Sequence, residues 1–268
     1  MEKSFRLRLK QPETLINFLV KFKSFDNNLL LEFKSSNEIK AKAFNVSKSV
    51  IKIGTIDFKE TFDQLDDQVI PENIRIRIFN IERLIKVLKS ISKDEIDLVL
   101  GCNLEENLKE DIYYVDQFVI ITKNLKMTIP QGTETLIKYL SDDIINSKIG
   151  IDNFYFQLEF TKEFLDKLDL LADLDQDEKV KIESFINDTK KVLKFSGKNF
   201  NLKSNDEFEI KENSQILIDK RSLKYIDKEN YCLYGKSSVN KDNKKLNCLL
   251  FDSKESNFKI LMASTVTE

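Results

Sequence analysis

The hydrophobic pattern of residues 74–100 changes its period twice. Over residues 74–78, isoleucine alternates with arginine, which predicts a β-strand with one face in solvent. From residue 81 the apolar positions recur at helical spacing, basic residues take the opposite side, and Asn80 is placed as the helix N-cap. Alternation then returns and stops at Gly101, where we expect a turn. The stretch therefore predicts a strand, a helix and a second strand.

The same strand-helix-strand unit recurs near residues 4, 153 and 215. In the third copy Thr161 is the expected N-cap, and the outer face of its helix mixes lysine with aspartate. The intervening segments predict further antiparallel strands, without a helix over 38–58. Four units in two halves indicate an internal duplication, with domains at 1–130 and 151–268 joined by a connector at 131–150.

Composition removes several classes of function. The chain of 268 residues is 41% hydrophobic and contains no histidine, which excludes serine-histidine and cysteine-histidine catalysis. Its three cysteines are too few for a disulfide framework or a CxxC metal site, and no glycine-rich phosphate loop is present. With no bilayer-spanning run and no signal-peptide pattern, we expect a soluble, intracellular protein with no membrane partner. The net charge is −2, so any contact with nucleic acid depends on locally segregated lysines.

The order of these segments resembles that of a known family over nearly the full length. The segments are RIFNIERLIKVLKSISKDEIDLVL, a mid-chain connector, a second copy of the design, and the closing runs DKENYCLYGK, KKLNCLLFDS and NFKILM. In this order the chain resembles DNA sliding clamps, the processivity factors of the proliferating cell nuclear antigen and tailed-phage replication clamp type. The resemblance implies an α+β DNA-clamp fold of two similar domains, each with two strand-helix-strand units, whose helices line a ring and whose antiparallel sheets form its outside.

The same resemblance implies the function and the assembly. Such a clamp encircles duplex DNA, tethers the replicative DNA polymerase for processive synthesis and is loaded by an ATP-driven clamp loader. It is not an enzyme and needs no cofactor or metal. Twelve helices packed ~10 Å apart leave a hole of ~28 Å, whereas eight leave only ~15 Å, too narrow for a duplex roughly 20 Å wide. A homotrimer is therefore the expected ring.

Lysine and arginine on the polar helix faces are the candidate DNA contacts, because they attract phosphates without reading bases. An ordinary solvated helix face is the alternative interpretation of each of them. The aspartates of the third helix depart from a uniformly basic lining. The candidates are Lys21, Lys23, Arg83, Lys86, Lys89, Lys93, Lys162, Lys167, Arg221, Lys224 and Lys228.

Partner proteins of such clamps insert a short peptide beside the connector, and position alone selects the wall of that pocket. Core or strand packing is the alternative interpretation of these residues. Subunits of such clamps join edge to edge, for which we expect residues 118–121 to pair with a strand near 200–208. The candidate pocket residues are Phe44, Val46, Ile129, Leu136, Ile137, Tyr139, Leu261 and Met262.

Two other classes of protein compete with the clamp. One is an enzyme that holds a divalent metal on paired carboxylates, at residues 66–67 or 142–143. The other is a non-enzymatic viral structural or assembly protein with duplicated β-rich domains. The lysine-, asparagine- and isoleucine-rich composition indicates an AT-rich genome, and the bacterial cytoplasm is the expected location if a phage encodes the chain.

Overall fold

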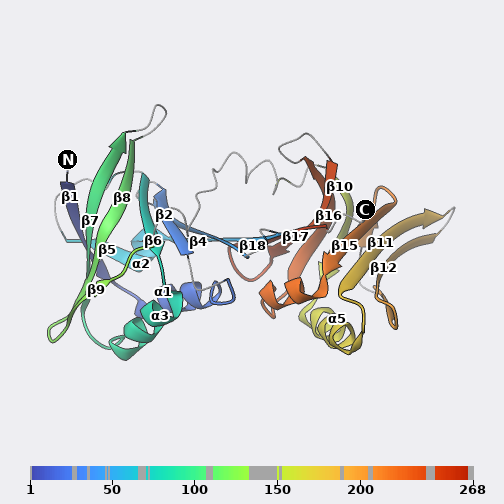
Figure 1. Ribbon diagram of the computed structural model, residues 1–268, viewed down its shortest axis with the longest axis horizontal. Helices are drawn as coiled ribbons and strands as arrows, with labels where there is room; N and C mark the ends of the chain where they lie inside the picture. The colour runs from blue at the N-terminus through green and yellow to red at the C-terminus, as the bar shows by residue number, and fades with distance from the viewer. Residues whose placement is uncertain are drawn as a thin grey trace. The chain divides into compact units, whose positions relative to one another are not determined.

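The structure is a computed structural model whose chain divides into two compact units (Figure 1). Unit 1 consists of Met1–Ala43 and Ile53–Tyr139, and unit 2 of Phe44–Lys52 and Leu140–Glu268. Most of the expected connector, 133–149, lies outside the described residues, so the domain boundaries stay a prediction. The structure describes residues 2–25, 29–34, 37–45, 47, 49–65, 71, 73–106, 111–132, 150, 153–187, 190–204, 208–239 and 245–264.

Unit 1 has helices on one face of a largely antiparallel sheet. The strand order is β3-β2-β6-β8-β7-β1-β5; β6 and β8 are parallel, and β9 also pairs with β8. Helices α1 and α3 lie together in Figure 1. The elements are β1 (Glu2–Leu9), α1 (Pro12–Val20), β2 (Leu29–Lys34), β3 (Glu38–Phe44), α2 (Phe58–Thr61), β5 (Phe62–Gln64), β6 (Asn73–Ile78), α3 (Ile81–Ser90), β7 (Ile96–Glu106), β8 (Asp111–Ile121) and β9 (Lys126–Ile129).

Unit 2 places one long helix beside two sheets. One sheet has the order β14-β10-β16-β17-β18, where β18 neighbours the start of β4, and the other has the order β13-β12-β11-β15. The elements are β4 (Val50–Asp57), which begins in unit 2 and ends in unit 1, β10 (Phe154–Phe160), α5 (Lys162–Leu174), β11 (Lys179–Asn187), β12 (Lys190–Ser196), β13 (Asn201–Lys203), β14 (Phe208–Ile210), β15 (Ser214–Asp219), the 3-10 helix η2 (Lys220–Tyr225), β16 (Tyr231–Val239), β17 (Lys245–Ser253) and β18 (Phe258–Ala263).

Each core forms where the apolar faces of the helices meet the sheets. In unit 1, Leu19 of α1 and Leu84 of α3 surround the same small apolar void as strand residues such as Leu98. In unit 2, Phe164 of α5 packs edge-to-face against Phe160 and Phe195, with ring centroids 5.3 and 5.0 Å apart. Such aromatic pairs add to the free energy gained from burial alone. The predicted periodicity of α3 and α5 is confirmed, because their apolar stripes are buried.

Both predicted N-caps are confirmed. The Asn80 side-chain oxygen accepts a hydrogen bond from the Arg83 backbone N–H at 2.8 Å, and Thr161 Oγ1 accepts one from the Phe164 N–H at 3.2 Å. Each cap satisfies a backbone donor that the first helical turn leaves open. The starts of α3 and α5 therefore lie where the sequence predicts them.

The prediction that the arginine face of strand β6 lies in solvent is wrong. Arg75 is only 3% exposed, because its Nε lies 3.2 Å from Glu32 Oε1 on the neighbouring strand β2. Lys42 of β3 contacts the second oxygen of the same carboxylate, and the side chains of Lys42 and Glu32 are each 1% exposed. Arg77 stacks over the ring of Tyr114 at 4.1 Å. The face opposite the helices therefore holds a buried carboxylate between two cations.

Two local expectations fail in the same unit. Gly101 does not end its strand, because β7 continues through it to Glu106 and the register against β8 shifts between Gly101 and Cys102. The glycine marks a β-bulge, in which one strand has an extra residue. A short helix, α2, begins at Phe58 where only strand was expected, and the Asp57 side chain accepts a hydrogen bond from the Glu60 N–H at 2.8 Å at its start.

Candidate functional site

Helix α3 presents a basic face. Arg83, Lys86 and Lys89 are exposed along the helix, and Lys93 is exposed in the turn that follows it. Across the part of the chain that the structure describes, none of these four side chains lies within ion-pair distance of a carboxylate. The buried stripe on the opposite side fixes the helix to the sheet, so the basic face points outward. Three cations on one helix and a fourth in the next turn can attract a polyanion.

The two lysines expected on the first helix lie just beyond its end. Lys21 is the C-cap of α1 and is half-buried, and Lys23 is exposed in the next turn. Lys23 Nζ lies 3.0 Å from Glu82 Oε1 at the start of α3, so it neutralises the one acidic residue of that helix. The packing of α1 against α3 thus brings Lys23 next to the basic face of α3.

The corresponding helix of unit 2 has a different surface. Lys162 and Lys167 are exposed on α5, which also carries Glu163 and three aspartates. Two leucines one turn apart are uncovered in this unit, since Leu170 is 61% exposed and Leu174 is 73% exposed. The outer face of α5 is therefore acidic and apolar.

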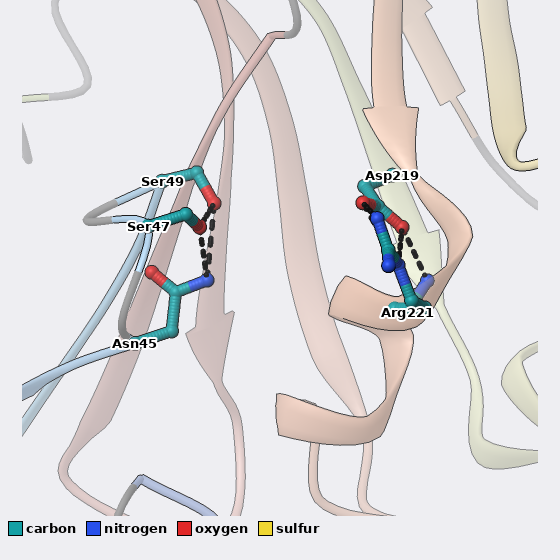
Figure 2. A network of polar contacts seen from close by, with 5 residues as sticks. All are labelled: Asn45, Ser47, Ser49, Asp219 and Arg221. Atoms are coloured by element: carbon teal, nitrogen blue, oxygen red, sulfur yellow. Dashed lines mark hydrogen bonds and ion pairs between the residues drawn. The ribbon is translucent and has the colours of Figure 1, made fainter.

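The fourth expected helix is a 3-10 helix that ends at Tyr225, so Lys228 lies beyond it. Lys228 Nζ contacts Asp166 Oδ1 of α5 at 2.6 Å, and this hydrogen bond raises the pKa of Lys228 above its ordinary value. Arg221 contacts Asp219, the N-cap of η2, at 2.6 Å (Figure 2). Their hydrogen bond raises the pKa of Arg221 and lowers the pKa of Asp219.

The two other cations of η2, Lys220 and Lys224, also make contacts within unit 2. Lys224 is exposed and lies over the ring of Tyr225, with Nζ 5.0 Å from the centroid. Lys220, which was not among the predicted site residues, donates from Nζ to the backbone oxygens of Ala172 and Asp175 at 3.2 and 2.8 Å. It thereby satisfies carbonyls at the C-terminus of α5. No pattern in the sequence distinguishes this lysine from its exposed neighbours.

The structure brings together two of the segments expected at the partner-peptide pocket. The Ala263 N–H at the end of β18 donates to the Ser49 carbonyl at 2.8 Å, so the loop after Phe44 lies beside that strand. The loop is held by its own polar groups: Asn45 Nδ2 donates to Ser47 Oγ and Ser49 Oγ, each at 3.0 Å (Figure 2). Asn45, Ser47 and Ser49 therefore lie beside the end of β18 in unit 2.

A buried apolar cluster in unit 2 includes Leu261 of β18. Leu261 packs with Tyr234, Cys248 and Leu250, and Ile51 is a partly buried residue packed against them. Position alone did not identify these neighbours, although alternation along β16 and β17 places them on one face.

Other expected pocket residues are placed differently. Met262 follows Leu261 directly in β18, so it points to the opposite face and cannot share a pocket wall with it. Ile129 is buried in β9 of unit 1, and Phe44 is half-buried at the end of β3. Val46, Leu136, Ile137 and Tyr139 lie outside the described residues.

The prediction that residues 118–121 form a free edge strand for pairing with another subunit is wrong. These residues of β8 pair with β7 on one side and with β9 on the other, for example Phe118 with both Leu100 and Ile129. Among the described strands, β9 is the one that leaves an edge open at this place, and β13 is one of the two end strands of the four-stranded sheet in unit 2, the other being β15. Open edges expose backbone groups that can pair with another chain.

Nothing in the described residues supports the competing metal enzyme. Within the described ranges, no three or more Cys, Asp or Glu side chains are grouped so that they could hold a metal ion. Both carboxylate pairs proposed for this role, 66–67 and 142–143, lie outside those ranges. Among the helices that the structure describes, each is too short or too polar to cross a bilayer.

Two units that each place strand-helix-strand segments with the helices on one face of antiparallel sheets define the DNA-clamp fold. Solved structures with this fold cover nearly the whole chain. The proliferating cellular nuclear antigen of Entamoeba histolytica matches with a TM-score of 0.62 and 15% identity over 98% of this chain and 99% of that one. The PCNA2–PCNA3 complex of Sulfolobus tokodaii matches with 0.58 and 12% over 97% and 98%.

A third similar structure extends the likeness to bacterial proteins. A chain described as a DNA polymerase III beta subunit from Eubacterium rectale matches with a TM-score of 0.61 and 15% identity, over 99% of this chain and 66% of that one. Compared by sequence, the chain matches no protein-family pattern and no curated protein. The similarity is therefore one of fold, and the chain has the α+β fold of sliding clamps.

Proposed function

We propose that this protein is a non-enzymatic sliding clamp that encircles duplex DNA as a homotrimeric ring and tethers a replicative DNA polymerase. The observation that carries the proposal is a clamp fold over nearly the whole chain, in which α3 exposes three cations on the helical side of the sheet and the turn after it exposes a fourth. Phosphate attraction of this kind is independent of base sequence, as sliding requires. An ATP-driven loader would open the ring, because a closed ring cannot thread onto circular DNA.

The trimer follows from the size of a duplex. Among the described residues, α1, α3, α5 and η2 are the helical segments of the four repeated units, so three chains supply twelve. Twelve helices ~10 Å apart enclose a hole of ~28 Å. For closure we propose that β9 of one protomer pairs with β13 of the next, since both edges are open among the described strands. This replaces β8, which already has two neighbours.

Tethering needs a surface for a partner peptide, and we propose the apolar cluster around Leu261 in unit 2. An extended peptide could place apolar side chains against Ile51 and Tyr234 beside the hydrogen-bonded Asn45 and Ser47. The cluster combines residues from four strands, β4, β16, β17 and β18, so its position in unit 2 is fixed by sheet pairing.

The test compares closed circular and linear DNA. The ring, loaded on a plasmid with a loader, should co-elute with the plasmid in gel filtration and leave when one restriction cut linearises it. Light scattering should give a trimer. A chain that stays monomeric at high concentration, or one that is retained equally on linear DNA with open ends, would refute the proposed function.

A further inference from the structure

We infer that the DNA-facing side of each protomer is divided: α3 of unit 1 contacts the phosphates of duplex DNA, whereas α5 and η2 of unit 2 make no phosphate contact. This inference rests on the proposed function. It concerns which residues the duplex touches, and each unit supports it separately.

The first argument is the balance of charge on the two helices. Between Ile81 and Ser90, α3 carries Arg83, Lys86 and Lys89 against Glu82 alone, three cations to one anion. Between Lys162 and Leu174, α5 carries two cations, Lys162 and Lys167, against four anions, Glu163, Asp166, Asp169 and Asp173. A phosphate that approaches α5 therefore meets net repulsion, and one that approaches α3 meets net attraction.

The second argument is which cations of each unit already form ion pairs with carboxylates. In unit 2, Lys228 is held by Asp166 and Arg221 by Asp219, each at 2.6 Å. A phosphate would have to displace these carboxylates, so such contacts gain little from releasing the counterions of DNA. On α3 the carboxylate is neutralised instead, since Lys23 Nζ, from outside the helix, lies 3.0 Å from Glu82 Oε1. The basic face of α3 keeps its charge.

The third argument is the exposed leucine pair. Leu170 and Leu174 stand one helical turn apart on α5 and are 61% and 73% exposed. Methyl groups offer no hydrogen bond to a phosphate oxygen, so these two exposed positions add no phosphate contact. DNA can therefore pass close to this surface of α5 without binding to it.

A duplex in such a ring would not sit on the axis. A hole of ~28 Å leaves ~8 Å of play around a duplex roughly 20 Å wide. That distance is about one Debye length at physiological salt, so attraction to α3 still acts on DNA across the gap. The duplex should therefore rest against the unit 1 helices of one protomer and exchange between the three equivalent positions.

The test uses two variants that each remove three exposed positive charges. The unit 1 variant is Arg83→Ala, Lys86→Ala, Lys89→Ala, and the matched control is Lys162→Ala, Lys167→Ala, Lys224→Ala. Circular dichroism and light scattering first establish that both fold and assemble like the unaltered protein. Affinity for a short duplex is then measured by fluorescence anisotropy over a range of salt concentrations.

The slope of log affinity against log salt falls by about 0.9 for each phosphate that the protein no longer neutralises. We expect the slope of the unit 1 variant to fall by about 1 to 3 and the slope of the control to stay unchanged. Equal decreases in both variants, or a decrease only in the control, would overturn the division of the surface. So would an unchanged slope in both. Retention on closed circular plasmid is recorded in parallel, so that a failure of the clamp itself is distinguished from a failure of this inference.

Discussion

Replacing Glu32 by Gln should be far more destabilising than the loss of one surface ion pair. The Glu32 carboxylate contacts both Lys42 and Arg75, and all three side chains are 3% exposed or less. Gln keeps the shape but removes the charge that compensates two buried cations. Removal of one partner from a buried pair costs about 3–5 kcal/mol, a large part of a typical domain's 5–15 kcal/mol. We therefore expect the urea midpoint to fall sharply.

The matched control is Asp63→Asn, which breaks the exposed pair of Lys10 and Asp63 in the same unit. Exposed pairs contribute about 1 kcal/mol or less, so this variant should unfold nearly like the unaltered protein. Urea is the denaturant of choice because it carries no charge, and protein concentration is held fixed because assembly shifts apparent stability. Equal urea midpoints for the two variants would refute the claim that the buried Glu32 carboxylate stabilises the protein more than an exposed ion pair does.

A second variant identifies the cause of the destabilisation. If uncompensated charge is responsible, replacing Glu32, Lys42 and Arg75 together by Leu and Met should restore most of the stability, because apolar residues of similar volume often replace buried ion clusters without cost. If the triple variant is less stable than Glu32→Gln alone, packing and hydrogen bonds outweigh the charge and the reasoning fails.

Three further predictions address other parts of the fold. Burial would raise the pKa of Asp97, but hydrogen bonds from Arg8 and Arg6 outweigh it and hold that pKa below its ordinary value. In urea unfolding, the unaltered protein should therefore be more stable than Asp97→Asn by its full margin above about pH 4, and this margin in the free energy of unfolding should shrink as the pH falls further. Gly235→Ala should cost about 1–3 kcal/mol or more in the same assay, since its Cβ would lie 2.1 Å from the ring of Phe156; an unchanged midpoint would contradict that packing. Burial raises the pKa of Cys102 to about 12, so this thiol should resist Ellman's reagent at pH 8 until the protein unfolds, and rapid native labelling would contradict it.

Helix α3 could be predicted from the sequence because its signals are local. Its N-cap, its apolar stripe and its basic face all lie within a few turns of chain, and each follows from the 3.6-residue period. The helix could also be assigned to one unit of a repeated design, since the strands on both sides obey their own period.

The errors concern contacts between residues far apart in the chain. Arg75 was expected in solvent because alternation shows that a strand has two faces, not what covers the second; the answer depends on Glu32, 43 positions away. Gly101 was expected in a turn because glycine marks several irregularities equally well, and only the register against β8 distinguishes a bulge. Which strand forms an open edge is likewise decided by pairing, not by composition.

The candidate site was predicted in the same partial way. Exposure of the α3 cations follows from periodicity, but the neutralisation of Lys228 by Asp166 depends on two segments 62 residues apart. The acidic character of the third helix is visible in the sequence, and the structure adds that Leu170 and Leu174 are exposed there. The separation of Leu261 from Met262 could have been predicted from strand alternation alone.

Segment Phe44–Lys52 comes early in the chain yet belongs to unit 2, where Lys52 Nζ is fully buried 2.5 Å from Asp227. A protease cut between the two units would therefore not release a self-sufficient C-terminal half, because that half would lack the start of β4 beside β18. The N-terminal fragment would carry the missing strand. The two fragments should accordingly complement each other by strand donation and remain one particle after cleavage, which makes this protein a candidate for a split reporter whose halves reassemble.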